Sequence, residues 1–316
     1  SIGLDRNLFQ SASAVRERVK GYAEATDGYL VLIVGQGKFP ADQVSEKLKV
    51  ISLGRFEAFF WRPRENFDLV TSQDPFETGM IARRLAKIAG AKLELQIHTD
   101  IGSPYFWRES LKNKIRFFLA KFLLPRADKI RVVSQRIKDY LVSDLGIVED
   151  KIYIKPIFVD IEKIKNTPVT INLRKKYPQF DKIILMASRL TREKNIDLAI
   201  KAMPTILKTL PKTGLLIVGT GPEEQKLKLK AKSYKLEASI IFENWVSQET
   251  LISYYKTCDL FLVTSLYEGY GMTLVEARAA GCKIISTDVG VAKEIGAHLI
   301  EHRPHSVTSM ILVIFS

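Results

Sequence analysis

The chain has 316 residues, which is long enough for two domains that each bury a core of their own. With 46% hydrophobic and 26% charged residues, the composition is that of a globular protein and excludes disorder throughout. The net charge of +13 indicates an anionic partner or surface, and composition alone leaves membrane lipid, nucleic acid and a polyanionic substrate open.

The first half of the chain alternates short apolar runs with helical stretches. It begins with the end of a strand before Gly3, and Ser11 and Ser13 are candidate caps for a helix through Ala25. Further helices are expected at residues 76–89 and 135–145. The expected strands cover residues 29–34, 49–53, 67–71, 92–97, 129–133 and 151–154. This βαβα alternation predicts a parallel sheet.

The periodicity lapses between residues 157 and 181, where prolines are spread through polar sequence. We therefore expect an acceptor-side domain at residues 1–158 and a domain that binds a nucleotide sugar at residues 159–316. The expected elements of the second domain are strands at 183–187, 215–218, 240–242, 259–264 and 283–287, with helices at 196–203 and 272–280. Two Rossmann-like halves joined by one linker predict a central cleft between two doubly wound parallel sheets.

Localisation is predicted from what the sequence lacks. No apolar run approaches the roughly 20 residues that span a bilayer, and no signal-peptide pattern is present. Cys258 and Cys282 fall beside or within expected buried elements, which indicates reduced thiols and a cytoplasmic protein. The stretch after Glu301 offers only part of one helix, so we expect a truncated C terminus.

The clearest candidate site is the βαβ unit from Cys258 to Gly296. Glu268 follows its first strand, Glu276 lies in the helix, and a turn with Gly269 and Gly271 separates them. The N–H groups at the start of this helix are suited to a phosphate, and an acid beside them can bind hydroxyls. Together they predict a nucleotide-sugar site. Alternatively, Glu276 is a solvated helix residue and Glu268 accepts only backbone hydrogen bonds.

The decapeptide EGYGMTLVEA resembles the E-G-F-G-x-x-x-x-E-A signature of retaining GT-B glycosyltransferases, the large family 4, with Tyr270 in the aromatic position. The resemblance implies that Glu276 binds ribose and Glu268 the transferred sugar. It also places the intervening turn in the donor site, which adds Gly269, Tyr270, Gly271, Met272 and Thr273 as donor-binding residues.

A second motif follows the strand at residues 183–187. SRLTREKN resembles the family's G-R-L-x-x-x-K-N motif, in which the Arg and Lys hold the donor phosphates, with Ser188 in place of the usual glycine. The resemblance assigns this role to Arg189 and Lys194. Two fixed cations stabilise a departing diphosphate; the alternative is a solvated loop with ordinary surface cations.

Two weaker donor contacts are expected on neighbouring strands. Gly219 lies in IVGTGPEEQKL, which also reads as a tight turn and lacks the third glycine of a dinucleotide fingerprint. In IIFENWVSQETL the family usually shows F-x-G-x-V, whose backbone pairs with the nucleobase. Asn244 occupies that glycine position here and tolerates left-handed geometry, so the expected base contacts are Trp245 and Val246.

The first half offers two acceptor-side residues. His98 in LELQIHTD ends a strand and is either a packed or capping residue or, by resemblance to the family's H-D region, a catalytic group near the transferred sugar and the acceptor hydroxyl. Thr99 separates it from Asp100, which leaves Asp100 without a clear role. By resemblance to the family's strand–Ser–helix unit, Ser134 lines the acceptor side.

The stretch from Trp107 to Lys138 is strongly basic, with ten Lys or Arg against Glu109 and Asp128. Residues 107–126 mix these cations with aromatic residues, a pattern typical of a helix at an anionic membrane surface on the inner face of the membrane. A helix that packs its aromatics into its own domain and exposes its lysines has the same pattern. No nucleic-acid-binding module accompanies the charge, so we expect no nucleic-acid partner.

The sequence contains no Asp-x-Asp, no zinc-type Cys/His cluster and no P-loop, so we expect neither a metal nor a cofactor. The resemblance implies a hexosyltransferase that uses a nucleotide diphosphate sugar and a hydroxyl acceptor on a glycan or lipid-linked precursor. In the implied mechanism the acceptor attacks from the leaving-group face, a donor phosphate oxygen takes its proton, and the anomeric configuration is kept. The alternative is a catalytically impaired GT-B protein that binds nucleotide sugar or polyanion.

Overall fold

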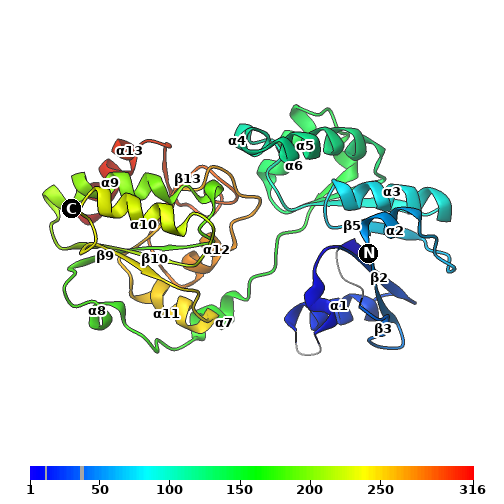
Figure 1. The fold of residues 1–316 in the computed structure, drawn as a ribbon, viewed down its shortest axis with the longest axis horizontal. Helices are drawn as coiled ribbons and strands as arrows, with labels where there is room; N and C mark the ends of the chain where they lie inside the picture. Colours follow the sequence, from blue (N-terminus) through cyan, green and yellow to red (C-terminus); the bar gives the residue numbers. More distant parts are fainter. Residues whose placement is uncertain (11–12, 36–38) are drawn as a thin grey trace. The chain divides into compact units, whose positions relative to one another are not determined.

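A computed structural model describes residues 1–10, 13–35 and 39–316 of the chain. The chain forms two compact units, Ser1–Lys155 and Pro156–Ser316, and each unit is built on its own sheet (Figure 1). Of the two expected caps of the first helix, Ser11 lies outside the described residues. Ser13 caps that helix, because its Oγ accepts a hydrogen bond from the N–H of Arg16 at 3.1 Å.

The sheet of the first unit has the strand order β3-β4-β2-β1-β5-β6-β7-β8 within the described residues. All neighbours run parallel except β3 and β4. β1 has β2 on one side and β5 on the other, so the sheet changes its direction of growth there, and such switch points are where open α/β sheets bind ligands. The strands are β1 (Ile2–Gly3), β2 (Tyr29–Val34), β3 (Asp42–Gln43), β4 (Leu48–Leu53), β5 (Leu69–Ser72), β6 (Lys92–Ile97), β7 (Lys129–Val132) and β8 (Ile152–Ile154).

Helices cover both faces of this sheet. Along β2, the alternate residues Val31 and Ile33 belong to one buried cluster with Val19 of the first helix, whereas Leu32 adjoins Leu85 of α3 on the opposite face. The helices are α1 (Ala14–Glu24), α2 (Arg55–Phe60), α3 (Glu77–Ala89), α4 (Pro104–Glu109), α5 (Leu111–Leu123) and α6 (Gln135–Ser143).

The second unit has an all-parallel sheet in the order β11-β10-β9-β12-β13-β14, and its switch point lies between β9 and β12. Its strands are β9 (Lys182–Ala187), β10 (Thr213–Val218), β11 (Ile240–Glu243), β12 (Leu260–Val263), β13 (Ile284–Thr287) and β14 (His298–Ile300). Its helices are α7 (Ile161–Asn166), α8 (Leu173–Lys176), α9 (Ile196–Thr209), α10 (Glu224–Ser233), α11 (Gln248–Thr257), α12 (Met272–Ala279) and α13 (Pro304–Phe315).

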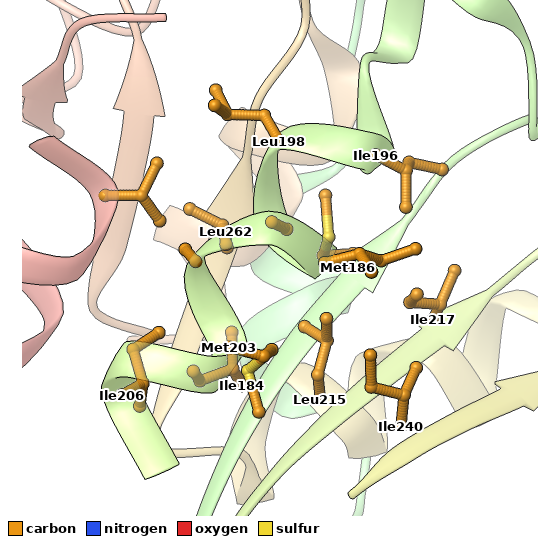
Figure 2. Close-up of a cluster of buried hydrophobic side chains, with 14 of the residues drawn as sticks. Ile184, Met186, Ile196, Leu198, Met203, Ile206, Leu215, Ile217, Ile240 and Leu262 are labelled. Atoms are coloured by element: carbon orange, nitrogen blue, oxygen red, sulfur yellow. The ribbon is translucent and has the colours of Figure 1, made fainter. Parts of the chain in front are cut away.

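Two buried clusters flank the second sheet. Figure 2 shows Met203 and Ile206 of α9 against Ile184 of β9 and Leu215 of β10, in a cluster that also takes in α10 and α13. On the other face, residues of α8, α11 and α12 pack on the alternate strand residues, among them Leu185. Both faces of the central strands are buried, and their nearly continuous apolar runs reflect this.

The expected strands are present, and their ends differ by no more than two residues. The helix expected to end at Met203 was too short: α9 continues to Thr209 with Pro204 inside it. Ile200, Met203 and Ile206 form one buried stripe, and we attribute the continuation to this burial, which offsets the N–H hydrogen bond that proline lacks. None of the described helices combines the length and the apolar character needed to cross a membrane.

Candidate active site

The polar residues singled out in the second unit gather at the carboxyl ends of β9 and β12. Arg189 and Lys194 lie on the segment between β9 and α9, and Glu268 lies between β12 and α12. These strands are neighbours although one follows the other by more than 70 residues, because the sheet grows outward from β9 in both directions. The switch point therefore brings the two segments together.

Lys194 and Glu268 form an ion pair, with Nζ to Oε1 at 2.5 Å. Their side chains are only 15% and 17% exposed, so the pair is more strongly coupled than a surface salt bridge. The same Oε1 accepts a hydrogen bond from Ser265 Oγ at 2.8 Å. Thr264 donates to the backbone carbonyls of Lys194 and Asn195, both at 3.0 Å, and so ties the two segments together.

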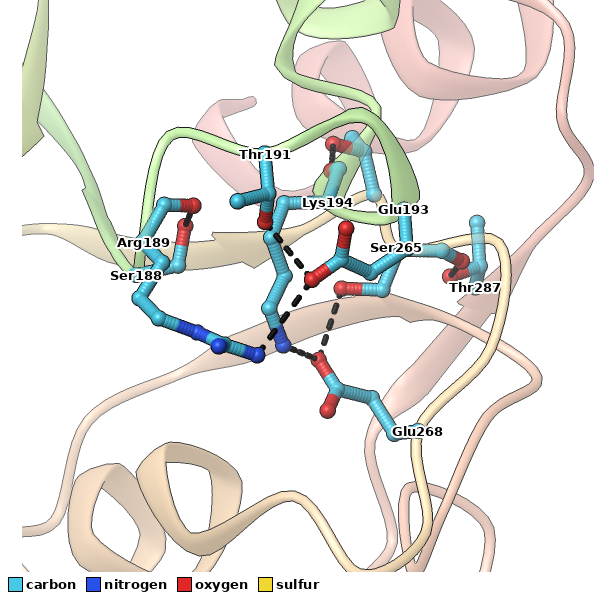
Figure 3. Close-up of polar contacts among 9 residues, drawn as sticks. Ser188, Arg189, Thr191, Glu193, Lys194, Ser265, Glu268 and Thr287 are labelled. Carbon is cyan, nitrogen blue, oxygen red and sulfur yellow. Dashed lines mark hydrogen bonds and ion pairs between the residues drawn. The ribbon is translucent and has the colours of Figure 1, made fainter. Parts of the chain in front are cut away.

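Arg189 lies beside this pair but has a different partner. Its guanidinium is 3.4 Å from Glu193 Oε1, which also accepts from the Thr191 hydroxyl at 2.6 Å. Figure 3 shows the Arg189 and Lys194 side chains directed to the same place as the Glu268 carboxylate. The Arg189 side chain is 67% exposed, so its charge is available to a ligand from solvent.

The turn between Glu268 and α12 is shaped by two glycines. Gly271 has φ +87° and is the N-cap of α12, and no side chain of the described residues caps that first turn. Gly290 has φ +51°, and a Cβ there would lie 2.3 Å from the carbonyl oxygen of Tyr270. Val291 donates its N–H to that oxygen at 2.9 Å. Residues after β13 therefore support the turn, and the N–H groups at the start of α12 remain available for an anion.

Glu276 does not join this contact network. It is 8% exposed, and Oε2 accepts from the buried Tyr255 hydroxyl at 3.4 Å. Burial of the carboxyl raises the pKa of Glu276 above its ordinary value, and the Tyr255 hydrogen bond offsets only part of this effect. Among the described residues no hydrogen bond or ion pair links Glu276 to Lys194 or Glu268. The solvated-helix interpretation of Glu276 is wrong, because the helix turns this carboxyl toward α11.

The glycine turn after β10 is packed against the Arg189 segment. A Cβ on Gly219 would lie 1.9 Å from the Ser188 carbonyl oxygen, and the φ of Gly219 is +135°. A Cβ on Gly221 would lie 2.4 Å from the Leu190 carbonyl oxygen. These glycines allow the turn after β10 to approach the backbone of the Arg189 loop closely. This close packing holds the loop in a defined position at the edge of the sheet.

Trp245 and Val246 follow β11 on the same edge. Trp245 is 56% exposed, and Val246 packs against the core. Asn244 is not among the non-glycine residues with positive φ, so the left-handed geometry considered for it is wrong.

The strand end before Trp245 is anchored by Glu243, which forms an ion pair with Lys176 at 2.5 Å and accepts from the Tyr254 hydroxyl at 2.8 Å. Tyr177 donates to the same carboxylate. Burial, followed by the hydrogen bond to Glu243, raises the pKa of Tyr177 to about 12. Such a network holds the segment that precedes Trp245 in a defined position.

His98 lies at the carboxyl end of β6 in the first unit. Its Nε2 is 3.2 Å from Gln96 Oε1. The residue reaches solvent, but desolvation of the ring, together with the positive charges of Arg131 and Arg18, lowers the pKa of His98 to about 4. The imidazole is therefore neutral at physiological pH.

Asp100 and Ser134 are both buried in the first unit. Asp100 accepts N–H bonds from Gly102 and Ser103 at 3.1 and 3.2 Å, so its carboxylate fixes the loop after His98. Ser134 is the N-cap residue of α6 and is 1% exposed. Its burial makes it a part of the sheet edge rather than an open contact surface.

Sequence reasoning missed three residues of this site. Glu193 holds Arg189, Ser265 holds Glu268, and Glu243 anchors the segment before Trp245. The spacing Thr191–Glu193 and Ser265–Glu268 was visible in the sequence as a hydroxyl followed closely by an acid. Nothing local indicated Glu243, because its partners Lys176 and Tyr177 lie more than 60 residues away.

No three His, Cys, Asp or Glu side chains converge as a metal-binding group anywhere in the part of the chain that the structure describes. In the charged contacts at the edge of the second sheet, both cations, Arg189 and Lys194, come from the segment after β9, and the segment after β12 contributes the acid Glu268. The arrangement suits an anionic group such as a diphosphate, with hydroxyl-binding acids close by.

Two family models match the chain, one in each unit. Residues 34–163 match "Glycosyltransferase Family 4", and residues 170–301 match "Glycosyl transferases group 1". The second range contains every candidate residue of the second unit, and the first contains His98 and Ser134.

Two curated proteins are similar along much of the chain. An uncharacterized glycosyltransferase of Methanocaldococcus jannaschii is 29% identical over 82% of this chain and 65% of its own length. The alpha-monoglucosyldiacylglycerol synthase of Streptococcus pneumoniae is 27% identical over 69% of this chain and 51% of its own length. The chain thus spans between about half and two thirds of these relatives.

Solved structures share the fold over the whole chain. Sucrose-phosphate synthase from Thermosynechococcus elongatus superposes with a TM-score of 0.76 at 19% identity, covering 99% of this chain and 88% of its own. HepE from Anabaena, in complex with UDP and glucose, gives 0.74 at 17% identity, covering 100% and 89%. At these identities the likeness shows the two-domain fold alone.

Proposed function

The chain belongs to family 4 of the glycosyltransferases and has their GT-B fold, and from this premise we propose that it transfers a hexosyl group from a nucleotide diphosphate sugar to a hydroxyl acceptor. The observation that carries the proposal is the Lys194–Glu268 ion pair with Arg189 beside it. Two cations and one acid at a single sheet edge match the charges of a diphosphate and the hydroxyls of a sugar.

Each residue has a part in the proposed reaction. Arg189 and Lys194 stabilise the negative charge that develops on the diphosphate as the glycosidic bond breaks. A lysine ammonium has three donors, so Lys194 can retain Glu268 and still bind a phosphate oxygen. Glu268 binds hydroxyls of the transferred sugar, and Glu276 binds those of the ribose. The Trp245–Val246 segment lies against the nucleobase.

The stereochemical outcome that we propose is retention. The acceptor hydroxyl attacks from the face of the leaving group, its proton passes to a phosphate oxygen, and the nucleotide diphosphate leaves. No protein base is required in this scheme, which suits a site where the nearest carboxylate, Glu268, is already paired with a cation. We also propose that the reaction is independent of divalent metal, because cations from the chain neutralise the leaving group.

The first unit is proposed to bind the acceptor. His98 is neutral at physiological pH and can therefore accept or donate a hydrogen bond to an acceptor hydroxyl. Two relatives carry lipids in their names, the alpha-monoglucosyldiacylglycerol synthase of Streptococcus pneumoniae and a diphospho-undecaprenol N-acetylgalactosaminyltransferase of Campylobacter jejuni. They favour a lipid-linked acceptor over a free glycan for this chain.

We further propose that α5 binds the cytoplasmic face of an anionic membrane. Leu111, Ile115, Phe118 and Phe122 follow one another at helical spacing and are 74%, 55%, 67% and 42% exposed, so the helix does not pack its apolar stripe into its own domain. Exposed lysines lie next to them. An apolar stripe with flanking cations is suited to anionic lipid headgroups.

Vesicle sedimentation tests this membrane proposal. Replacing Lys112, Lys114 and Lys121 with serine should lower binding to vesicles that contain anionic phospholipid, while neutral vesicles bind neither protein. In a control variant, the exposed residues Lys175, Lys208 and Lys232 of the second unit are replaced with serine, so the variant loses the same net charge. An equal loss of vesicle binding in both variants would show that the effect depends on net charge alone, and it would contradict a role for α5.

A donor panel tests the enzymatic proposal. The full chain is incubated with UDP-, GDP- and ADP-sugars, and release of nucleotide diphosphate is followed with and without EDTA. Release that chelation leaves unchanged is expected. Tight binding of one donor without release, in the presence of candidate acceptors, would instead favour a binding protein that has lost turnover. Release that EDTA abolishes would contradict metal independence.

A further inference from the structure

The first unit contains an apolar pocket that none of the site residues explains. It has a volume of about 590 Å³, within the range of about 300–1,000 Å³ that small-molecule sites occupy. Its lining includes Leu4, which follows β1, and Val34, which ends β2. The pocket therefore lies at the carboxyl edge of the first sheet, beside the switch point at β1. We call it the α2 pocket.

The apolar part of its lining is rich in aromatic residues. Three phenylalanines of the short helix α2 line it: Phe56, Phe59 and Phe60, which are 79%, 40% and 59% exposed. The buried side chains of Val34 and Ile81 complete the apolar part of the lining. Exposing three aromatic rings to water is unfavourable, and a cluster of them around a concavity marks a binding site for an apolar group.

Two arginines border the same pocket. Arg116 donates its Nε–H to both oxygens of Glu77, at 3.0 and 3.2 Å, so its charge is held in place and largely neutralised. The Arg55 side chain makes no ion pair or hydrogen bond within the described ranges 1–10, 13–35 and 39–316, and it is exposed. Because the acid in the lining, Glu77, is already paired with Arg116, Arg55 presents an uncompensated positive charge beside the apolar walls.

The positive charge continues beyond Phe59. A neighbouring hollow of about 380 Å³ shares Phe59 and is lined by Arg62, Arg83, Arg84 and Lys87, with no acidic residue in its lining. α3 carries Arg83, Arg84 and Lys87, and Arg62 follows α2. Figure 1 shows α2 and α3 side by side. Apolar walls next to a group of cations are complementary to an amphiphile, a molecule with an apolar chain and an anionic head.

We propose that the α2 pocket binds the apolar chain of a lipid phosphate, with the phosphate against Arg55. The inference deepens the proposed function, on which it rests, by naming the acceptor as an amphiphile held by its tail. His98 ends β6, which is two strands away from β1 along the sheet. At a strand spacing of about 4.8 Å, the reacting hydroxyl would lie about 10 Å from the β1 side of the pocket, where Leu4 lines it. A sugar residue or a glycerol-type headgroup has the reach to join the hydroxyl to this side of the pocket.

The test measures binding of dodecyl phosphate to the full chain by calorimetry, below the concentration at which it forms micelles. Inorganic phosphate and dodecanol are titrated separately, and anionic vesicles form a further arm. We expect dodecyl phosphate to bind more tightly than either inorganic phosphate or dodecanol. A variant with Phe56→Ser and Phe60→Ser should weaken its binding by about tenfold or more, because the apolar contact area is lost. Arg55→Glu should weaken dodecyl phosphate but leave dodecanol binding unchanged.

Matched controls separate the pocket from general effects. Phe158 is 83% exposed and lies in the second unit, and Arg64 is exposed and lines neither the α2 pocket nor its neighbour. Phe158→Ser and Arg64→Glu should bind dodecyl phosphate as the unmodified chain does. Equal affinity in the pocket and control variants, or binding of vesicles without binding of monomeric dodecyl phosphate, would overturn the proposal.

The experiment does not depend on turnover. If no donor sugar yields nucleotide diphosphate while dodecyl phosphate still binds through Phe56, Phe60 and Arg55, the proposed function fails and the lipid site remains. If donors turn over while the pocket variants bind dodecyl phosphate normally, the reverse holds. Thermal unfolding of the Phe56→Ser/Phe60→Ser variant should match that of the unmodified chain, because both rings are exposed.

Discussion

The two sheets present different chemistry at their carboxyl edges. At the edge of the second sheet, Lys194, Glu268 and Glu193 are half-buried and each has a charged or hydroxyl partner within 3.4 Å. At the edge of the first sheet, aromatic rings of α2 are exposed around a pocket, and Arg55 has no partner in the part of the chain that the structure describes. The same architecture thus carries a preorganised polar site in one unit and an apolar, cationic site in the other.

The difference indicates two kinds of ligand. Paired charges cost little to keep in place and are ready to exchange one partner for a ligand of fixed geometry, such as a diphosphate. Exposed aromatic rings and an arginine without a partner among the described residues are stabilised when a ligand with an apolar chain and an anionic group covers them.

Removing Lys194 would break the polar site most severely. In Lys194→Ala, the Ser265 hydroxyl is the one partner that Glu268 retains among the described residues, and one of the two cations proposed for the leaving group is lost. We expect kcat/KM to fall by about 10²–10³-fold, as when one preorganised donor is removed from a charge-stabilising site. Steady-state kinetics with the best donor measure this.

Lys226→Ala is the matched control, because Lys226 pairs with Glu223 at 2.7 Å but its side chain is 75% exposed. Its kinetics should not change, since exposed pairs contribute little. A loss in Lys194→Ala no larger than in this control would remove Lys194 from the site.

Gly219→Ala tests whether the polar edge is rigid. A Cβ would lie 1.9 Å from the Ser188 carbonyl oxygen, and φ of +135° is strained for alanine. The Arg189 loop would have to shift, and we expect the free energy of unfolding to fall by about 3 kcal/mol. Urea denaturation measures the change. Gly21→Ala, at a helical position with open space around it, should be neutral or stabilising by up to about 1 kcal/mol.

Glu276→Gln sharpens the distinction between the two glutamates. Donor affinity should fall by about tenfold to a hundredfold, because hydrogen bonds from ribose hydroxyls to a carboxylate are charge-assisted. The free energy of unfolding should rise, whereas the donor affinity falls. The folded protein raises the pKa of Glu276, so ionisation favours the unfolded state, and this cost is present at neutral pH.

The direction of the Glu276 pKa shift defines the pH range in which this cost is present. Below the unfolded pKa of about 4.5 the carboxyl is protonated in both states and the cost disappears. The glutamine variant should therefore be more stable than the unmodified chain at pH 7 and equally stable near pH 4. Unfolding curves at both values test this, and a glutamine variant that is less stable at pH 7 would contradict the assigned burial.

His98 tests whether the imidazole at the carboxyl edge of the first sheet is neutral, and at neutral pH the effect of replacing it on stability should be the smallest of these. Because its folded pKa is about 4, below the ordinary 6.5, the unfolded state gains the proton first as the pH falls. Its contribution to stability is present above pH 6.5 and is lost progressively toward pH 4. His98→Gln should unfold with a weaker pH dependence within that window. An inflection near pH 6.5 in kcat/KM that disappears in this variant would show that the imidazole titrates normally.

The sequence predicted the strands well because buried parallel strands are short, apolar and bounded by polar turns, as at residues 29–34 and 92–97. It also indicated which strand ends carry Arg189, Lys194 and Glu268. It did not predict that Glu276 points to Tyr255, because one turn of helix decides whether a carboxyl faces solvent or the neighbouring α11.

The α2 pocket was beyond sequence reasoning for a similar reason. In RFEAFF the phenylalanines Phe56, Phe59 and Phe60 have the i, i+3, i+4 spacing typical of a buried helix face, and nothing local shows that these rings remain exposed while Ala58 is buried. The partners of Glu243 were likewise set by tertiary contacts between α8, β11 and α11. Local pattern predicts elements, whereas the surroundings of a side chain depend on which elements meet.

Calorimetric titration of the matching nucleoside monophosphate and diphosphate tests whether the edge of the second sheet binds a diphosphate, because the two ligands differ only in the phosphate that Arg189 and Lys194 are proposed to hold. We predict that the diphosphate binds the unmodified chain at least about tenfold more tightly. We also predict that this preference disappears in an Arg189→Ala/Lys194→Ala variant. Equal affinity for the two nucleotides, or a preference that survives the double substitution, would contradict diphosphate binding at this edge.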